Sequence, residues 1–273
     1  MHKTMISPAL TRHRRIQFTL AWTLAFAVLL VALFGTVRYE PILTDFFDWP
    51  ILLKLNHYVF PGTLNHLISG VSNLPILTGA LLAGLFWYVW FESNSESEKA
   101  ELFLGLGAAV AAVILSRGLQ LTLPTHLRPL HDPVPGFDVP PGIDPAVLSG
   151  WNSFPSDHAC VYFALTTVIW RRSQLLGLFA LLPALIGSLP RIYLGLHYPS
   201  DVAFGALLGI FIVMMVENYG PETFARRAIL FEQKRPGMFY SCGFLLTYEV
   251  ATLFEDIRKT GAGLADAYRL FGP

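Results

Sequence analysis

Five residues that could carry out acid–base or anion chemistry stand at or near the ends of apolar stretches, where ionisable side chains are costly. They are Arg128, His158, Arg191, His197 and Asp201. Arginine offers planar, permanently charged donors that suit phosphate oxygens. A neutral histidine held by a carboxylate can attack phosphorus, and a second, protonated histidine can donate to the departing oxygen. No carboxylate cluster suited to Mg²⁺ accompanies them, so these residue types predict phosphoryl transfer without a metal.

Each of these residues also has a purely structural explanation. An arginine near a membrane interface commonly extends its charge into the lipid headgroups. Asp201 could cap a helix that begins at or after Pro199. The functional interpretation therefore depends on convergence, because these residues would have to meet from different hairpins at one face of the protein.

Six apolar segments could position these residues. The first, 18–37, holds twenty residues without a charge, which as a helix would cover about 30 Å and is too long for a signal-peptide core. The others lie at 75–91, 101–123, 156–170, 174–196 and 199–216. The sequence predicts an all-α, six-span transmembrane bundle over 1–217, whose core at 101–217 carries the site, and a short cytoplasmic or interfacial C-terminal region over 218–273.

Three other stretches bear on the membrane arrangement. Residues 64–74 form an amphipathic pattern that is typical of a segment lying at the surface. Trp87, Tyr88 and Trp90 resemble an aromatic belt at one interface. Residues 238–254 are apolar but interrupted, so an interfacial helix, a short soluble cap and a seventh span all remain open.

The composition supports a membrane protein. The chain of 273 residues is 53% hydrophobic and only 14% charged, whereas soluble domains carry about 25% charged residues. Its net charge of zero argues against a nucleic-acid partner. The two cysteines, Cys160 and Cys242, are too few for a disulfide scaffold and have no metal-ligand spacing.

The distribution of basic residues predicts the orientation of the bundle. Of the 19 Lys and Arg residues, fourteen fall on the side of the two termini, so both termini should be cytoplasmic. The multi-pass protein would then lie in a plasma membrane of the bacterial inner-membrane type. The candidate residues would share the outer, periplasmic face, beneath a proline-rich cover formed by residues 124–152.

The spacing of the candidate residues resembles that of a known family. Arg191, five residues, His197, three residues and Asp201 resemble the third signature of the type 2 phosphatidic acid phosphatase superfamily. Residues 154–158 (Phe-Pro-Ser-Asp-His) are similar to its second signature, Pro-Ser-Gly-His, and Arg128-Pro129 to the end of its first, Lys, six residues, Arg-Pro. The resemblance covers about residues 101–217. Within the family, the chain resembles the branch of membrane lipid phosphatases and undecaprenyl diphosphatase-like proteins.

The resemblance implies a role for each matching residue. His197 would form a phosphohistidine, Asp201 would orient it, and His158 would be the general acid for the leaving group. The phosphate oxygens would be held by Arg128, Arg191, Ser156 and the backbone amide of Asp157. The resemblance implies no metal and no cofactor.

This chain departs from the family pattern at three positions. The family lysine would fall at position 121, where this chain has Leu121. Three residues could replace its phosphate contact: Arg117, His126 and His131. Pro190 replaces the serine before Arg191 and should bend the fifth span. Asp157 replaces the usual glycine, and its carboxylate is expected to face away from the anionic substrate.

The function expected from these features is hydrolysis of lipid phosphate monoesters or diphosphates, isoprenoid diphosphates included, at the outer leaflet. Phosphatidic acid, phosphatidylglycerophosphate and undecaprenyl diphosphate all fit, and the sequence does not choose among them or set the oligomeric state. The alternative is a catalytically weak or inactive protein of the same fold that binds or transports lipid phosphates.

Overall fold

The computed structural model describes residues 44–57, 62–74, 77–132 and 135–255, together with positions 24, 27, 257 and 260. The described part of the chain is helical and contains no β-strand. A π-helical turn, η1 (Thr44–Asp48), is followed by ten helices: α3 (Trp49–Asn56), α4 (Gly62–Asn73), α5 (Gly79–Glu92), α6 (Glu96–Thr122), α7 (Asp157–Arg172), α8 (Gln174–Ser188), α9 (Pro190–Tyr193), α10 (Pro199–Tyr219), α11 (Glu222–Lys234) and α12 (Pro236–Ala251).

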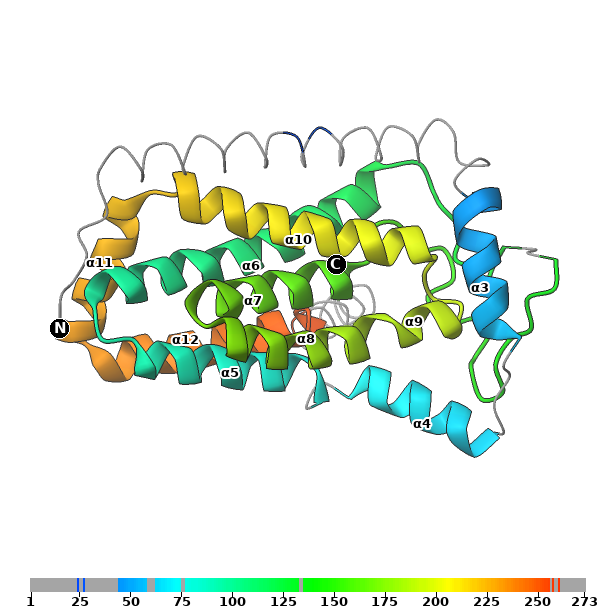
Figure 1. The fold of residues 1–273 in the computed structure, drawn as a ribbon, viewed down its shortest axis with the longest axis horizontal. Coiled ribbons are helices and arrows are strands. Elements are labelled where there is room, and N and C mark those ends of the chain that lie inside the picture. The colour runs from blue at the N-terminus through cyan, green and yellow to red at the C-terminus, as the bar shows by residue number, and fades with distance from the viewer. Residues whose placement is uncertain are drawn as a thin grey trace, which may run out of the picture.

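The long helices run side by side and α7 lies among them, packed against α5, α6, α8 and α10 (Figure 1). Glycines allow α10 to approach α7 closely. A β-carbon at Gly205 would lie 2.3 Å from the Ser156 carbonyl oxygen, and one at Gly209 would lie 1.9 Å from that of Cys160. Gly205 and Gly209 form the small-xxx-small spacing that lets membrane helices pack backbone to backbone. This contact brings the start of α10 beside the start of α7.

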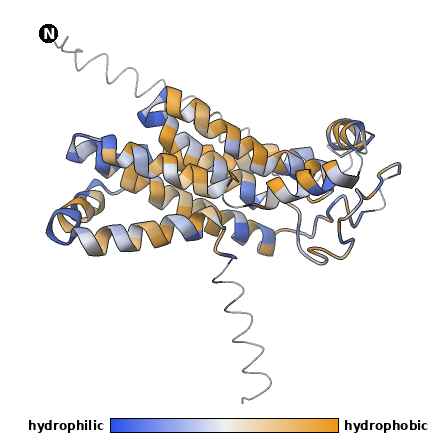
Figure 2. Cartoon of the chain, turned by 90° about the horizontal axis from the view of Figure 1, so that it is seen from below, coloured by the Kyte–Doolittle hydropathy of each residue, from blue (hydrophilic) through white to orange (hydrophobic). Residues whose placement is uncertain are grey.

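Within the described part of the chain, three helices are long and apolar enough to cross a membrane. They are Glu96–Thr122, Gln174–Tyr193 and Pro199–Tyr219, and Gly79–Glu92 is a shorter apolar helix. Apolar residues cover much of the length of these helices, and hydrophilic residues gather at their ends and in the loops (Figure 2). The predicted first span at 18–37 lies outside the described residues. The helix starting at Gln174 is interrupted at Leu189, directly before Pro190, as that proline predicts.

The C-terminal helices correct one expectation about the aromatic residues. Trp87 and Trp90 do not form an interfacial belt, because both are buried in the core. Helix α12 packs against α5, the Trp87 indole N–H donates to Thr247 Oγ1 at 2.9 Å, and the Trp90 ring lies 5.4 Å from that of Phe239. Tyr88 alone of the three is exposed.

Candidate active site

The candidate residues converge where α7 and α10 begin. Asp201 lies in the first turn of α10, and its backbone carbonyl accepts a hydrogen bond at 3.1 Å from the backbone N–H of Ser156, the residue that caps α7. His158 is the second residue of α7, and His197 stands just before α10. The carbonyl of Arg191, in α9, accepts from the backbone N–H of His197 at 3.2 Å. Residues separated by up to 73 positions therefore meet at one end of the bundle.

His197 is held so that one ring nitrogen is occupied and the other faces an arginine. Its Nδ1 lies 2.9 Å from the Ser153 carbonyl oxygen and 3.6 Å from Asp201 Oδ2. A carbonyl oxygen can only accept, so Nδ1 carries the proton and Nε2 has the lone pair. Nε2 lies 3.5 Å from Arg128 Nη1. Burial lowers the pKa of His197, which favours this neutral form.

Asp201 is held by groups that the sequence signatures do not include. Its Oδ2 accepts from the backbone N–H of Tyr198 at 2.8 Å and from the hydroxyl of Ser153. Ser153 therefore contacts both members of the pair, Asp201 through its hydroxyl and His197 through its carbonyl. Its position two residues before Pro155 gave no indication of this role, because both contacts reach more than forty residues along the chain.

Both arginines of the signatures are buried. Arg128 is 3% exposed. Its Nη1 donates to the Leu196 carbonyl, and its Nη2 donates to the Asn152 carbonyl at 3.3 Å. Its Nε has no protein partner among the described residues. Arg191 is 6% exposed, and its Nε donates to the Gly187 carbonyl at 3.1 Å. Burial lowers the pKa of Arg128, but a guanidinium stays protonated, so its positive charge is retained in a site of low polarity.

Three residues of the second signature, Ser156, Asp157 and His158, lie at the start of α7. The Ser156 hydroxyl accepts from the backbone N–H of Ala159 at 3.5 Å and Asp157 Oδ1 accepts from that of His158 at 2.9 Å, so side chains occupy two of the first three amides of α7. The carboxylate of Asp157 pairs with the histidine that follows it. Its Oδ1 lies 2.8 Å from Nδ1 of His158, so the side chain turns back onto the neighbouring histidine.

Residues 100–223, which contain all of these groups, match the family model described as the PAP2 superfamily. This segment resembles a PAP2 domain. Its sequence relatives are matched over short stretches. The chain is 36% identical over 123 residues to decaprenylphosphoryl-5-phosphoribose phosphatase of Mycobacterium tuberculosis, covering 44% of this chain and 60% of the relative. It is 42% identical over 64 residues to lipid A 4′-phosphatase of Bacteroides thetaiotaomicron, covering 23% of this chain and 28% of that protein.

The chain is also similar to a third relative and to one solved structure. The chain is 42% identical over 71 residues to the bacitracin transport permease protein BcrC of Bacillus licheniformis, covering 26% of this chain and 35% of the relative. It thus spans less than two thirds of the length of each of these curated relatives. The crystal structure of a transmembrane PAP2 type phosphatidylglycerolphosphate phosphatase from Bacillus subtilis superposes with a TM-score of 0.51, at 19% identity, over 72% of this chain and 94% of that one. This likeness shows that the fold is that of a PAP2 membrane phosphatase.

The residues considered as replacements for the lysine of the PAP2 pattern lie in different surroundings. Leu121 is 70% exposed, so position 121 faces away from the buried site. Arg117, one turn earlier, donates to Gln120 Oε1 at 2.6 Å and stacks 4.1 Å from the Trp151 ring. His126 packs edge-on against Tyr198, with ring centroids 5.0 Å apart.

The loop between α6 and α7, which was expected to form a cover, contacts the segment that precedes α10. The Tyr198 hydroxyl donates to Asp132 Oδ2 at 2.7 Å, and the backbone N–H of Leu130 donates to the Gly195 carbonyl at 2.9 Å. His131, the remaining candidate for the lysine contact, is half-buried in this loop, and its Nε2 lies 3.1 Å from the Pro145 carbonyl oxygen. It therefore takes part in the structure of the loop.

A carboxylate from before the PAP2-like segment also contacts the site. Asp48, in η1, is 1% exposed, and its two oxygens accept from the backbone N–H and the hydroxyl of Ser200, each at 2.7 Å. Ser200 immediately precedes Asp201 at the start of α10. Burial raises the pKa of Asp48 to about 6. The sequence pattern did not single out Asp48, because it lies outside the signatures.

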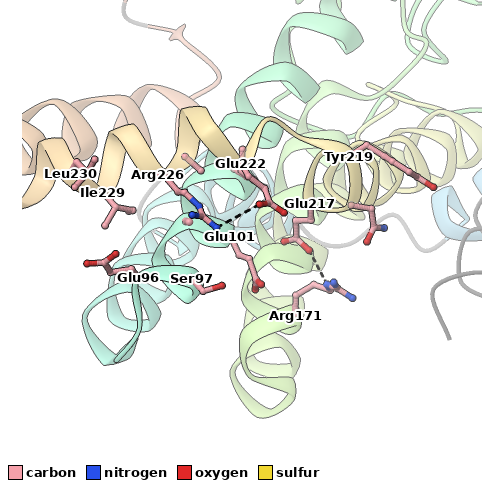
Figure 3. A pocket seen from close by; sticks show the side chains of 14 residues that line it. Glu96, Ser97, Glu101, Arg171, Glu217, Tyr219, Glu222, Arg226, Ile229 and Leu230 are labelled. Atoms are coloured by element: carbon pink, nitrogen blue, oxygen red, sulfur yellow. Dashed lines mark hydrogen bonds and ion pairs between the residues drawn. The ribbon is translucent and has the colours of Figure 1, made fainter. Parts of the chain in front are cut away.

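A cavity of about 1090 Å³ lies at the other end of the bundle (Figure 3). It is lined by the start of α6, the ends of α7 and α10, and α11. Two ion pairs lie among its lining residues: Arg171 Nε lies 2.8 Å from Glu217 Oε2, and Arg226 lies 3.9 Å from Glu222. None of the signature residues lines it, so it is separate from the candidate active site of the PAP2-like segment.

Proposed function

We propose that this protein is an integral membrane phosphatase that hydrolyses lipid phosphate monoesters or diphosphates through a phosphohistidine on His197, without a metal. The proposal includes six membrane spans, cytoplasmic termini and a site at the outer leaflet. One observation carries it. His197 has its Nδ1 occupied by the Ser153 carbonyl at 2.9 Å, and its Nε2 faces Arg128 at 3.5 Å. A nucleophilic nitrogen is thereby placed beside a cation that can hold the group it attacks.

The first chemical step is attack of His197 Nε2 on phosphorus. An N–P bond forms, the bond from phosphorus to the leaving oxygen breaks, and the electron pair of that bond stays on the leaving oxygen. The positive charge that develops on the imidazole is stabilised by the buried carboxylate of Asp201, 3.6 Å from Nδ1. Ser153 holds both side chains in position, Asp201 through its hydroxyl and His197 through its carbonyl.

The charge on the transferred phosphoryl oxygens is met by fixed donors. Arg128 Nε–H has no partner among the described residues, and the start of α7 adds the positive end of a helix dipole. Arg191 lies within electrostatic range of Asp157 at the same helix start. Donors that are already oriented cost little reorganisation during the reaction, which is the main source of electrostatic catalysis.

The leaving group and the water of the second step require proton transfer. His158 gives a proton to the leaving oxygen, and the resulting neutral imidazole can then accept a proton from the water that attacks the phosphohistidine. The N–P bond breaks, its electron pair returns to His197 Nε2, and inorganic phosphate leaves. One histidine must be neutral and the other protonated for the first step.

A lipid substrate fits the position of the site and the names of the relatives. The site lies at the ends of apolar helices, where a headgroup can stay in water while its chain remains in the bilayer. Two relatives are named for phosphorylated lipids, lipid A and a decaprenyl-linked phosphoribose. Phosphatidic acid, phosphatidylglycerophosphate and undecaprenyl diphosphate are therefore the substrates to test first.

The test is phosphate release by the purified protein in detergent, with each of these lipids and with EDTA present. We expect release that persists in EDTA and is lost in His197→Ala, while Glu222→Gln, an exposed carboxylate at the other end of the bundle, keeps wild-type activity. A requirement for added metal would contradict the mechanism. Binding of lipid phosphate without any release would instead favour the alternative of a binding or transport protein.

The proposed orientation has its own test. Cys160 is fully buried and Cys242 is exposed, so a membrane-impermeant maleimide should report Cys242 alone. We expect no labelling in intact cells and labelling after permeabilisation. Labelling of intact cells that disappears in Cys242→Ser would place α12 outside and reverse the orientation.

A further inference from the structure

The carboxylate of Asp157 forms a close pair with the histidine beside it. Asp157 Oδ1 lies 2.8 Å from Nδ1 of His158 and also accepts the backbone N–H of His158 at 2.9 Å. The two side chains are only 15% and 20% exposed. The matching position of the family signature is a glycine, which cannot make this contact. We propose, on the basis of the function proposed above, that Asp157 is a positioning residue for His158. The site then contains two carboxylate–histidine pairs, one at each histidine.

The pair restricts the orientation of the His158 ring. The contact to Asp157 fixes Nδ1, and the Tyr162 ring packs edge-on against the imidazole with centroids 5.8 Å apart. Tyr162 is itself anchored, since its hydroxyl lies 3.2 Å from Thr78 Oγ1. With Nδ1 committed to the carboxylate, Nε2 is the ring nitrogen that remains to carry a proton to substrate.

The carboxylate also supports the charge state that a general acid needs. His158 lies within electrostatic range of Arg191 and His197, and the positive charge of Arg191 opposes an imidazolium at this place. A carboxylate at 2.8 Å acts against that repulsion. When the bond from phosphorus to the leaving oxygen breaks, the Nε2 proton moves to that oxygen and His158 becomes neutral, with its Nδ1–H still donated to Asp157.

Asp157 also has a structural role that the test must separate from this one. It is the first residue of α7, and an acidic side chain there stabilises a helix through its dipole. Loss of this effect would lower the stability of the fold and weaken turnover of every substrate alike. Loss of positioning would weaken turnover only where the leaving group needs a proton.

The experiment therefore compares two leaving groups on one lipid. The diacylglycerol of short-chain phosphatidic acid leaves as an alkoxide that needs a proton. In the analogue with sulfur as the bridging atom, the lipid leaves as a thiolate that needs none. The value of kcat/KM for each substrate is measured in detergent for the wild type, Asp157→Gly, Asp157→Asn and His158→Ala. Asp157→Asn keeps the side-chain shape and serves if the glycine lowers the yield of folded protein. Glu222→Gln is the matched control for removal of a carboxylate.

We expect Asp157→Gly to lose about tenfold or more with the oxygen lipid, part of the roughly 10²- to 10⁴-fold that general acid catalysis supplies, and to stay within about threefold with the sulfur analogue. His158→Ala should show the same selectivity to a larger degree. Equal losses on both substrates, or no loss on either, would overturn the role of Asp157 while leaving the phosphatase function intact. If the wild type releases phosphate from neither lipid, or His158→Ala loses both equally, the proposed mechanism itself is wrong.

Discussion

Replacement of Gly205 by alanine tests whether the close approach of α10 to α7 builds the active site. Gly205 faces the carbonyl oxygen of Ser156, the residue that caps α7. One turn before Gly205, Asp201 accepts the backbone N–H of Ser156 through its own carbonyl. The contact therefore lies beside the interface that sets the positions of His197 and His158.

The size of the perturbation follows from the geometry. A β-carbon at Gly205 would lie 2.3 Å from the Ser156 oxygen, whereas ordinary contacts of this kind begin at 3.4 Å, so the helices must separate by about 1 Å. Overpacking of this degree costs about 1–3 kcal/mol of stability. A misplacement of about 1 Å between reacting groups can cost about 10²-fold in rate. We therefore expect kcat to fall about 100-fold in protein that remains folded.

The assay is phosphate release in detergent, together with thermal unfolding of the same samples. Gly107→Ala in α6 is the matched control, because no heavy atom lies within 4 Å of the β-carbon it would add. That variant should keep full activity and gain up to about 1 kcal/mol from helix propensity. Wild-type kcat in Gly205→Ala would refute the reasoning, since the helix contact would then not determine the geometry of the site.

Two further predictions concern residues outside the family signatures. Because burial raises the pKa of Asp48 to about 6, above the value of about 3.9 in an unfolded chain, the folded protein binds this proton more tightly. As the pH rises from about 4 to about 6, the free energy of unfolding should then fall by about 3 kcal/mol on account of Asp48. The difference in melting temperature between wild type and Asp48→Asn should shrink or reverse over that range. A constant difference would contradict the shift in pKa. Ser153→Ala removes the hydroxyl that Asp201 accepts while keeping the carbonyl that holds His197, so kcat should fall about tenfold at unchanged KM, as expected for a hydrogen bond to a charged group. Unchanged kcat in Ser153→Ala, with exposed Ser149→Ala as control, would count against that contact.

The parts of the site that could be predicted from the sequence are those encoded by local spacing. His197 and Asp201 are four residues apart across a helix start, so their relationship is determined by the backbone of one turn. The apolar segments at 101–123 and 199–216 correspond to α6 and α10, because a long apolar run has few other ways to fold. Helix boundaries differ by a few residues, as at Glu96, where Ser95 caps α6 earlier than the apolar run begins.

The parts that could not be predicted depend on contacts between distant residues. Ser153 lies just before the second signature but is not part of it, and its role appears only when α7 and α10 are placed together. Trp87 and Trp90 have the composition of an interfacial belt, and only the packing of α12 shows that they are buried. The close contact of α10 does have a signal in the sequence, because Gly205 and Gly209 stand four residues apart in an apolar segment, a spacing typical of closely packed membrane helices.

The contact between Asp48 and Ser200 bears on how this protein can be divided or recombined. Residues 100–223 are the unit that homology recognises, but a carboxylate from before that unit completes the hydrogen bonding at the start of α10. A chimaera that inherits only the matched segment would replace Asp48 with whatever its new neighbour supplies. The segment matched by sequence comparison is thus shorter than the part of the chain that forms the hydrogen bonds around the site. A transplanted domain should therefore include residues 44–56.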